Sequence, residues 1–253
     1  MAENTEKTTL TEGANDEMLQ KMFGAGVHWG HKKAKGHPKM KPYILTTRQN
    51  VQIINVEKTL EKLNEAAAFL KDIVATGGVV LVVATKMPSK TLVKGFAEKT
   101  GMPYVEERWL GGTITNFPML SKRLEFFLGQ EAKTAKGEFA NKTKKEQLLI
   151  SRDIERLEKK MGGMKTLKKI PHALLIVDIG EHMAAVREAK RTGVPVVAIS
   201  DTNTDPTLVT HPIPANDKSA LSVSFILDYL AKAMNEGKQQ AQTAVAAASS
   251  AKQ

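Results

Sequence analysis

Residues 171–206 read PHALLIVDIGEHMAAVREAKRTGVPVVAISDTNTDP, and the order of their apolar runs decides the fold class. Two short runs, Ala173–Val177 and Val194–Ile199, are almost wholly apolar, which is typical of strands buried on both faces. Between them, Glu181–Arg191 has a helical pattern. A buried strand, a helix and a second buried strand in succession predict one unit of a parallel sheet.

The same alternation continues on both sides of this unit. A further buried strand is predicted at Val79–Ala84, another strand at Tyr104–Arg108, and the first strand of the sheet at Val51–Asn55. The remaining helical patterns are Glu57–Ala75, Ser89–Thr100 and Ala220–Met234. The chain is therefore predicted to be an α/β protein with a doubly wound parallel sheet.

One segment, residues 116–169, interrupts this alternation because it contains no credible strand. It has two helical patterns around a polar turn near Gly137, with apolar residues spaced alternately three and four apart. We predict an antiparallel coiled-coil hairpin that projects from the body and ends at Gly162-Gly163, the alternative being two ordinary helices packed on the sheet. The predicted seam consists of Phe117, Leu120, Leu124, Phe127, Ile150, Ile154, Leu157 and Met161.

These patterns divide the chain into four parts. Residues 1–17 are polar and lack apolar periodicity, so we expect a mobile N-terminal tail. Residues 18–115 and 170–237 form the predicted α/β body, and residues 116–169 form the hairpin inserted into it. Residues 238–253 are a low-complexity tail rich in Ala, Gln and Ser, either a frayed helix or disordered.

The composition excludes several classes of protein. The 253 residues include no cysteine, which rules out disulfides, thiolate nucleophiles and cysteine-based zinc sites. No apolar run approaches the roughly 20 residues that span a bilayer, and the polar start of the chain is unlike a signal peptide. We therefore expect a cytoplasmic protein with no membrane partner. The formal net charge of +10 favours a polyanionic partner such as nucleic acid.

The positive charge is concentrated in two segments. His28–Arg48 carries six lysine and arginine residues and no acidic residue, whereas Pro118–Lys169 carries 14 against seven acidic residues. Glycine and proline residues interrupt the first segment, which predicts a loop whose lysines can each meet a phosphate. The alternative is a solvated basic loop. Trp29 and Tyr43 could stack on bases, but we favour a structural role for both as core anchors.

The sequence contains no convincing catalytic motif. The glycines of Gly24–Gly30 are spaced one residue too far apart for a dinucleotide-binding fingerprint, and no buried strand precedes them. There is also no phosphate-loop motif, no nucleophile elbow and no HExxH motif. No catalytic residue, cofactor or small-molecule substrate is therefore expected.

The stretch SDTNTDP, residues 200–206, follows a predicted strand at the edge where doubly wound folds bind ligands. Asp201 and Asp205 could serve as a carboxylate pair, or could bind a metal together with His28 and His31. We favour a structural turn in which the Asp201 side chain bonds its own backbone, and we expect no metal.

Several long motifs resemble the family of bacterial small-subunit ribosomal protein S-two, from about Met18 to Met234. They are GVHWGH, HPKMKPYI and NVQIINVEKT near the N-terminus, RWLGGTITNF at Arg108–Phe117, TKKE at Thr143–Glu146, and the stretch from residue 171 to residue 206.

The resemblance implies a flavodoxin-like sheet with a protruding coiled-coil hairpin, and a structural, non-enzymatic role in translation. It implies a position between the head and body of the small subunit, bound to 16S ribosomal RNA and neighbouring ribosomal proteins. It also implies a docking role for the mRNA-binding protein S-one, where that protein is present. The stretch KKAKGH between His31 and Pro38 departs from the arginine and aromatic residue of many members, which puts stacking there in doubt.

Carried over to this sequence, the resemblance assigns two sets of residues. The expected RNA-binding residues are Lys32, Lys33, Lys35, Lys39, Lys41, Arg48, Lys142, Lys144, Lys145 and Arg152. The expected anchors of the hairpin base are Arg108, Trp109, Gly111 and Gly112. An α/β enzyme with a deep pocket at the SDTNTDP edge, and a free-standing RNA-binding regulator, are the competing hypotheses.

Overall fold

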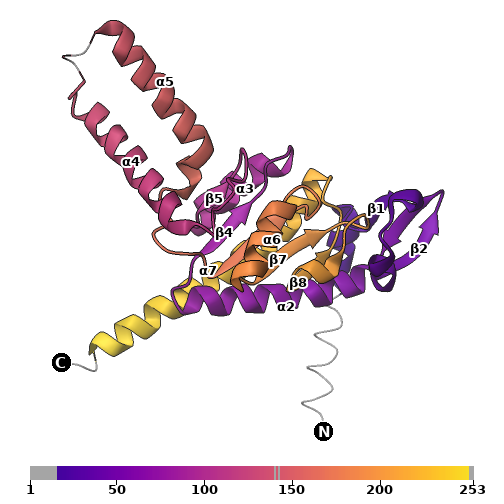
Figure 1. Ribbon diagram of the computed structural model, residues 1–253. Helices are drawn as coiled ribbons and strands as arrows, with labels where there is room; N and C mark the ends of the chain where they lie inside the picture. The colour runs from indigo at the N-terminus through magenta and orange to yellow at the C-terminus, as the bar shows by residue number, and fades with distance from the viewer. Residues whose placement is uncertain (1–15, 140, 142, 251–253) are drawn as a thin grey trace.

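Five strands form a parallel sheet in the order β5-β4-β6-β7-β8 (Figure 1). This is a computed structural model, and it describes residues 16–139, 141 and 143–250. The strands are β4 (Val80–Val83), β5 (Tyr104–Val105), β6 (Ala173–Val177), β7 (Val196–Ser200) and β8 (His211–Pro214). The chain first builds outward from β4 to β5 and then crosses to β6 on the other side of β4, which is consistent with the predicted doubly wound fold.

Successive side chains of the central strands enter two separate hydrophobic cores, because side chains alternate between the faces of a sheet. Val80, Val82 and Leu175 face one core, which α2 (Val56–Ala75), α3 (Ser89–Thr100) and α7 (Ala220–Ser250) cover. Leu81, Val83 and Leu174 face the other core, which includes residues of α6 (Met183–Thr192) and of the base of α4 (Phe117–Ala135). Burial on both faces explains why these strands read as continuous apolar runs.

The prediction that Val51–Asn55 supplies the first strand of the parallel sheet is wrong. Val51–Ile54 is β3, the middle strand of a separate antiparallel sheet with β1 (Trp29–Lys32) and β2 (Ile44–Arg48). Its residues alternate between buried and half-buried, as expected for a strand with one face on a core. Gln49 and Asn50, both with positive φ, join β2 to β3 in the two-residue turn that suits a hairpin.

Two edge strands differ from their predictions. The predicted strand Tyr104–Arg108 is reduced to the two residues of β5. Strand β8 was not predicted, because Pro212 and Pro214 argue against a strand in the interior of a sheet. Both prolines are tolerated because β8 lies at the edge of the sheet.

The helices of the body agree closely with their predictions. Helix α3 has the predicted bounds and ends at Gly101, which is left-handed. Helix α2 begins at Val56, where the side chain of Asn55 accepts hydrogen bonds from the backbone of Glu57 and Lys58. Helix α7 passes the predicted end at Met234 and continues to Ser250. Residues 16–24 are also helical, so the described end of the predicted N-terminal tail is ordered.

The segment predicted as a hairpin contains two helices, α4 and α5 (Lys144–Met161), which extend away from the sheet (Figure 1). Thr143 and Glu146 form a capping box at the start of α5. At the base, Lys165 forms ion pairs with Glu131 of α4 at 2.9 Å and with Glu158 of α5 at 2.7 Å. The α4 side of the predicted seam and Met161 are buried, whereas Ile150, Ile154 and Leu157 are half-buried.

Candidate nucleic-acid interface

The basic segment, residues 32–48, is a loop only in part, because Lys32 ends β1 and Ile44–Arg48 is β2. We keep the name basic loop for residues 32–48, in which two short 3-10 helices, Lys33–Lys35 and Pro38–Tyr43, connect the two strands. Met40 is fully buried and fixes the second of these helices to the body. His37 caps that helix, because its Nδ1 accepts a hydrogen bond from the backbone of Lys39. The predicted RNA-binding residues of the loop, all exposed, are Lys32, Lys33, Lys35, Lys39, Lys41 and Arg48.

Lys39 differs from the other basic residues of the loop because it has partners within the protein. Its ammonium group lies 2.7 Å from Oδ2 of Asp205 and donates a 2.9 Å hydrogen bond to Oγ1 of Thr207. Burial raises the pKa of Asp205, but hydrogen bonds from Lys39 and Thr207 outweigh it and lower that pKa to about 2. Lys39 therefore fastens the loop to the body.

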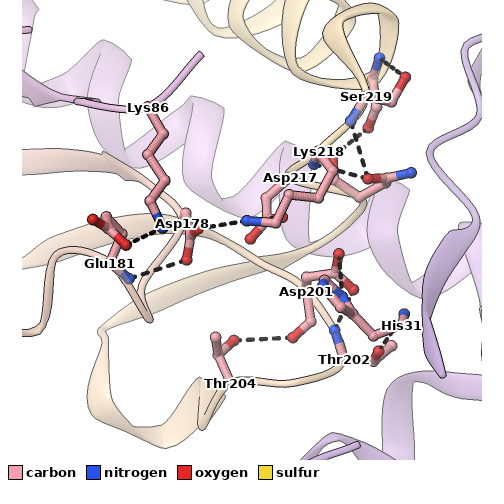
Figure 2. A network of polar contacts seen from close by, with 12 residues as sticks. His31, Lys86, Asp178, Glu181, Asp201, Thr202, Thr204, Asp217, Lys218 and Ser219 are labelled. Atoms are coloured by element: carbon pink, nitrogen blue, oxygen red, sulfur yellow. Dashed lines mark hydrogen bonds and ion pairs between the residues drawn. The ribbon is translucent and has the colours of Figure 1, made fainter. Parts of the chain in front are cut away.

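The SDTNTDP turn is hydrogen-bonded to the segment where the basic loop begins, and Figure 2 shows His31 beside Asp201 and Thr202. The backbone of His31 donates a hydrogen bond to Oγ1 of Thr202, and the backbone of His37 donates one to the Thr202 carbonyl. Nδ1 of His31 lies 2.9 Å from Oδ2 of Asp201, while Oδ1 of Asp201 accepts a hydrogen bond from the backbone of Thr202. The prediction of a structural turn at Asp201 is confirmed.

A second group of charges lies beside this turn, at the carboxyl edge of the sheet (Figure 2). Lys218 lies 2.7 Å from Asp178 and 3.2 Å from the buried carboxylate of Asp217, and Lys86 pairs with Glu181. Burial, followed by the nearby negative charges of Asp178 and Asp201, raises the pKa of Asp217 to about 7. The charges of this edge are thus largely paired with one another.

This edge contains a cavity of about 190 Å³, which Lys86, Asp178, His182, Asp217 and Lys218 help to line. The carboxylates that the enzyme hypothesis required do not line it. Asp201 and Asp205 instead pair with His31 and Lys39. Within residues 16–139, 141 and 143–250, no group of three or more His, Asp or Glu residues is placed to hold a metal ion.

The basic residues of the hairpin form a second exposed group. Lys144 and Lys145 lie in the first turn of α5, and Arg152 lies two turns further along it. Lys142 lies outside the described residues. The structure does not bring these residues near the basic loop, since α5 and the β1–β2 sheet lie at opposite ends of the molecule (Figure 1). Any nucleic acid contacting both groups must therefore reach across the body.

The hairpin base depends on a residue that the sequence analysis missed, Glu188 of α6. Its carboxylate accepts hydrogen bonds from Nε1 of Trp109 at 3.0 Å and from the backbone of Gly112, Ile114 and Thr115. Burial raises its pKa, but these donors outweigh burial, and the pKa of Glu188 is lowered overall. No motif marks this glutamate, because its partners lie more than 70 residues earlier in the chain.

The four predicted anchors of the hairpin base have different environments. Trp109 is buried, whereas Arg108 is exposed. Gly112 has a φ of +86°, which glycine adopts without strain, and Gly111 has open space around it.

Trp29 and Tyr43 were both expected to be core anchors. For Trp29 this expectation is wrong, because 47% of the side chain is exposed at the start of β1. Tyr43 is half-buried. The exposed indole of Trp29 thus lies at the margin of the basic loop.

None of the described helices is long and apolar enough to cross a membrane.

The family model described as Ribosomal protein S2 matches residues 22–237. The small ribosomal subunit protein uS2 of Roseiflexus sp. (strain RS-1) is 42% identical over 232 residues, which cover 91% of this chain and 88% of that protein.

Two further relatives carry the same name. The protein of Corynebacterium urealyticum is 42% identical over 235 residues, covering 92% of this chain and 87% of its own length. The protein of Nocardia farcinica is 40% identical over 221 residues, covering 87% of this chain and 78% of its own length. Such a match over nearly the whole described body shows that the chain belongs to the ribosomal protein S2 family, which is structural and not enzymatic.

Proposed function

We propose that this chain is a cytoplasmic, structural constituent of the small ribosomal subunit that binds 16S ribosomal RNA and serves translation. The single observation that carries the proposal is the basic loop. Among the residues that the structure describes, the side chains of Lys32, Lys33, Lys35, Lys41 and Arg48 are exposed and form no ion pair. Exposed cations without internal partners are free to neutralise phosphates and release counterions.

The hairpin supplies the second part of the proposed RNA-binding surface. Lys144, Lys145 and Arg152 are exposed on α5, and Lys142 precedes them in the sequence. We propose that α4 and α5 pack as an antiparallel coiled coil, which the spacing of the apolar residues along both helices supports. A rigid hairpin would hold these cations at a fixed distance from the basic loop.

The finer placement rests on the family. Membership supports a flavodoxin-like body located between the head and body of the small subunit, next to neighbouring ribosomal proteins. The strand order, with the first strand of the sheet between the second and the third, agrees with a flavodoxin-like sheet. Docking of S-one belongs to the same proposal, and co-sedimentation of purified S-one with subunits that contain or lack this chain tests it.

Sedimentation of a cell lysate through sucrose gradients at low and high salt tests the main proposal. The chain should travel with the small subunit and be stripped by salt. A chain that stays at the top of both gradients would contradict the proposal. If that free chain bound a short RNA specifically, a free-standing regulator would replace it.

A binding titration against purified 16S ribosomal RNA then locates the contacts. The double variant Lys33→Ala/Lys41→Ala should lower the slope of log affinity against log salt by about two units. The matched control is Lys94→Ala/Lys190→Ala, which removes the same charge from exposed positions on α3 and α6. Equal losses in both variants would mean that overall charge, and not the basic loop, holds the RNA.

A further inference from the structure

Three neighbouring aromatic rings beside the basic loop, tilted against one another by 52° and 38°, form a group that we call the aromatic ladder. The ring centroids of Phe23 and His28 are 5.0 Å apart, and those of His28 and Trp29 are 4.9 Å apart. Phe23 is 49% exposed and Trp29 is 47% exposed, so both ends of the ladder face solvent. Burial lowers the pKa of His28, which favours the uncharged form of the middle ring.

The ladder stands on a rigid support. Met22 and Val27, which flank its residues in the sequence, are fully buried in the core that α2 and α7 cover. The carbonyl of His28 accepts a hydrogen bond from the backbone of Ile54 in β3, and the carbonyl of Val27 accepts one from Asn216. The exposure of Trp29 is therefore a property of a well-anchored segment and not of a loose end.

Space and contact at Trp29 also favour a fixed ring. A Cβ atom added to Gly26 would lie 3.4 Å from Cδ1 of the indole, and the backbone of Trp29 donates a 3.4 Å hydrogen bond to the Gly26 carbonyl. His28 supports the ring on another side. A large aromatic ring that is oriented in advance and half exposed is well suited to stack on a flat ligand, because little conformational entropy is lost on binding.

The surrounding charge indicates what that ligand is. Lys32 ends the same strand, three residues beyond Trp29, and therefore lies within about 10 Å of it along β1. No acidic residue occurs between His28 and Arg48. An aromatic ring next to several unpaired cations matches a nucleotide, whose base stacks while its phosphate pairs with lysine.

We propose that Trp29 stacks on one unpaired base of the bound RNA while Lys32 and its neighbours hold the adjoining phosphates. The proposal rests on the RNA-binding function proposed above and assigns a contact to the ladder that charge alone does not provide. A base inside a duplex is already stacked on both faces, so the target is a loop, a bulge or a single-stranded segment.

Intrinsic fluorescence during titration with purified 16S ribosomal RNA tests the proposal. The chain has two tryptophans, and the second, Trp109, is buried against Glu188, so a Trp29→Phe variant reveals which residue responds. Binding should quench the emission of the native chain and leave that of Trp29→Phe nearly unchanged. Trp29→Ala should lose about 5- to 150-fold in affinity, with an unchanged salt slope, whereas Trp29→Phe should keep most of it.

The matched control is Ile170→Ala, which removes an apolar side chain of similar exposure, 46%, from outside both proposed RNA-binding groups and should not change the affinity. If RNA binds with the expected salt slope but Trp29→Ala binds equally well and the emission does not change, the stacking proposal is wrong and the proposed function stands. If RNA does not bind at all, the stacking proposal and the proposed RNA-binding function are both wrong. If the emission changes only on addition of a ribosomal protein, the ladder docks a protein and stacking on RNA is excluded.

Discussion

Nε1 of Trp109 donates a 3.0 Å hydrogen bond to Oε1 of Glu188, and this contact joins the base of the hairpin to helix α6. The same carboxylate also accepts hydrogen bonds from the backbone N–H groups of Gly112 and Ile114. One side chain therefore holds the turn from which α4 begins. Because charge-assisted hydrogen bonds are stronger than neutral ones, the bonds to this carboxylate should stabilise the turn strongly.

Replacement of Glu188 by Gln should destabilise the protein by roughly 1–3 kcal/mol. Both carboxylate oxygens accept hydrogen bonds, and an amide NH₂ group in place of either oxygen would face N–H donors. Urea unfolding of the native chain, of Glu188→Gln and of the exposed control Lys190→Gln measures the difference. Equal stability of the glutamine variant and the native chain would show that the turn does not need the carboxylate.

Replacement of Gly112 by Ala should cost about 1–2 kcal/mol. The backbone of Gly112 has a φ of +86°, and the added Cβ would lie 3.2 Å from Cβ of Asn116. Gly111 is the natural control, because a Cβ there meets nothing within 4 Å and its φ is not in the left-handed range. Thermal unfolding of both variants measures the difference. Equal decreases in melting temperature would show that Gly112 has no special role.

Lys39 and Lys41 should respond differently to replacement by Ala. Lys41→Ala should weaken RNA binding modestly and lower the salt slope by about one unit, without affecting stability. Lys39→Ala should release Asp205, whose pKa would rise from about 2 towards its ordinary value. Carboxyl titration by NMR measures that pKa, and salt-dependent binding measures the slope. If Lys39→Ala left the pKa of Asp205 unchanged but lowered the salt slope of RNA binding, Lys39 would not be the residue that fastens the loop to the body.

Asp217→Asn should stabilise the protein at neutral and alkaline pH but not at pH 4. The pKa of Asp217 is raised from 3.8 to about 7 in the folded state, so stability falls as the pH rises through this interval. The asparagine variant lacks that loss, and its advantage should grow between pH 4 and pH 7 and then level off. Because the pKa of Asp217 is raised by about three units, the gain in free energy of unfolding should be no more than about 4 kcal/mol.

Urea unfolding at a series of pH values measures this dependence on Asp217. The control is Asp228→Asn, which removes an exposed carboxylate on α7. A constant difference between Asp217→Asn and the native chain from pH 4 to pH 8 would show that the Asp217 carboxyl is not held in its neutral form.

Elements whose pattern is local can be predicted from the sequence. The strands β4, β6 and β7 are continuous apolar runs because both of their faces are buried, and α3 has the bounds that its periodicity predicted. The basic loop was visible as an acid-free run of lysines, and all six of its predicted residues are exposed. Family membership likewise followed from the order of the motifs.

Contacts between residues of different elements could not be predicted from the sequence. The placement of β3 in a separate sheet, the edge position of β8, the pairing of Lys39 with Asp205 and the contact of Glu188 with Trp109 all join distant segments. The exposure of Trp29 was equally out of reach, because an aromatic residue in a sequence does not reveal which side of a strand the core occupies. Composition and periodicity indicate which faces of a segment are buried and which are exposed. Contacts between residues far apart in the sequence depend on how the helices and strands pack together.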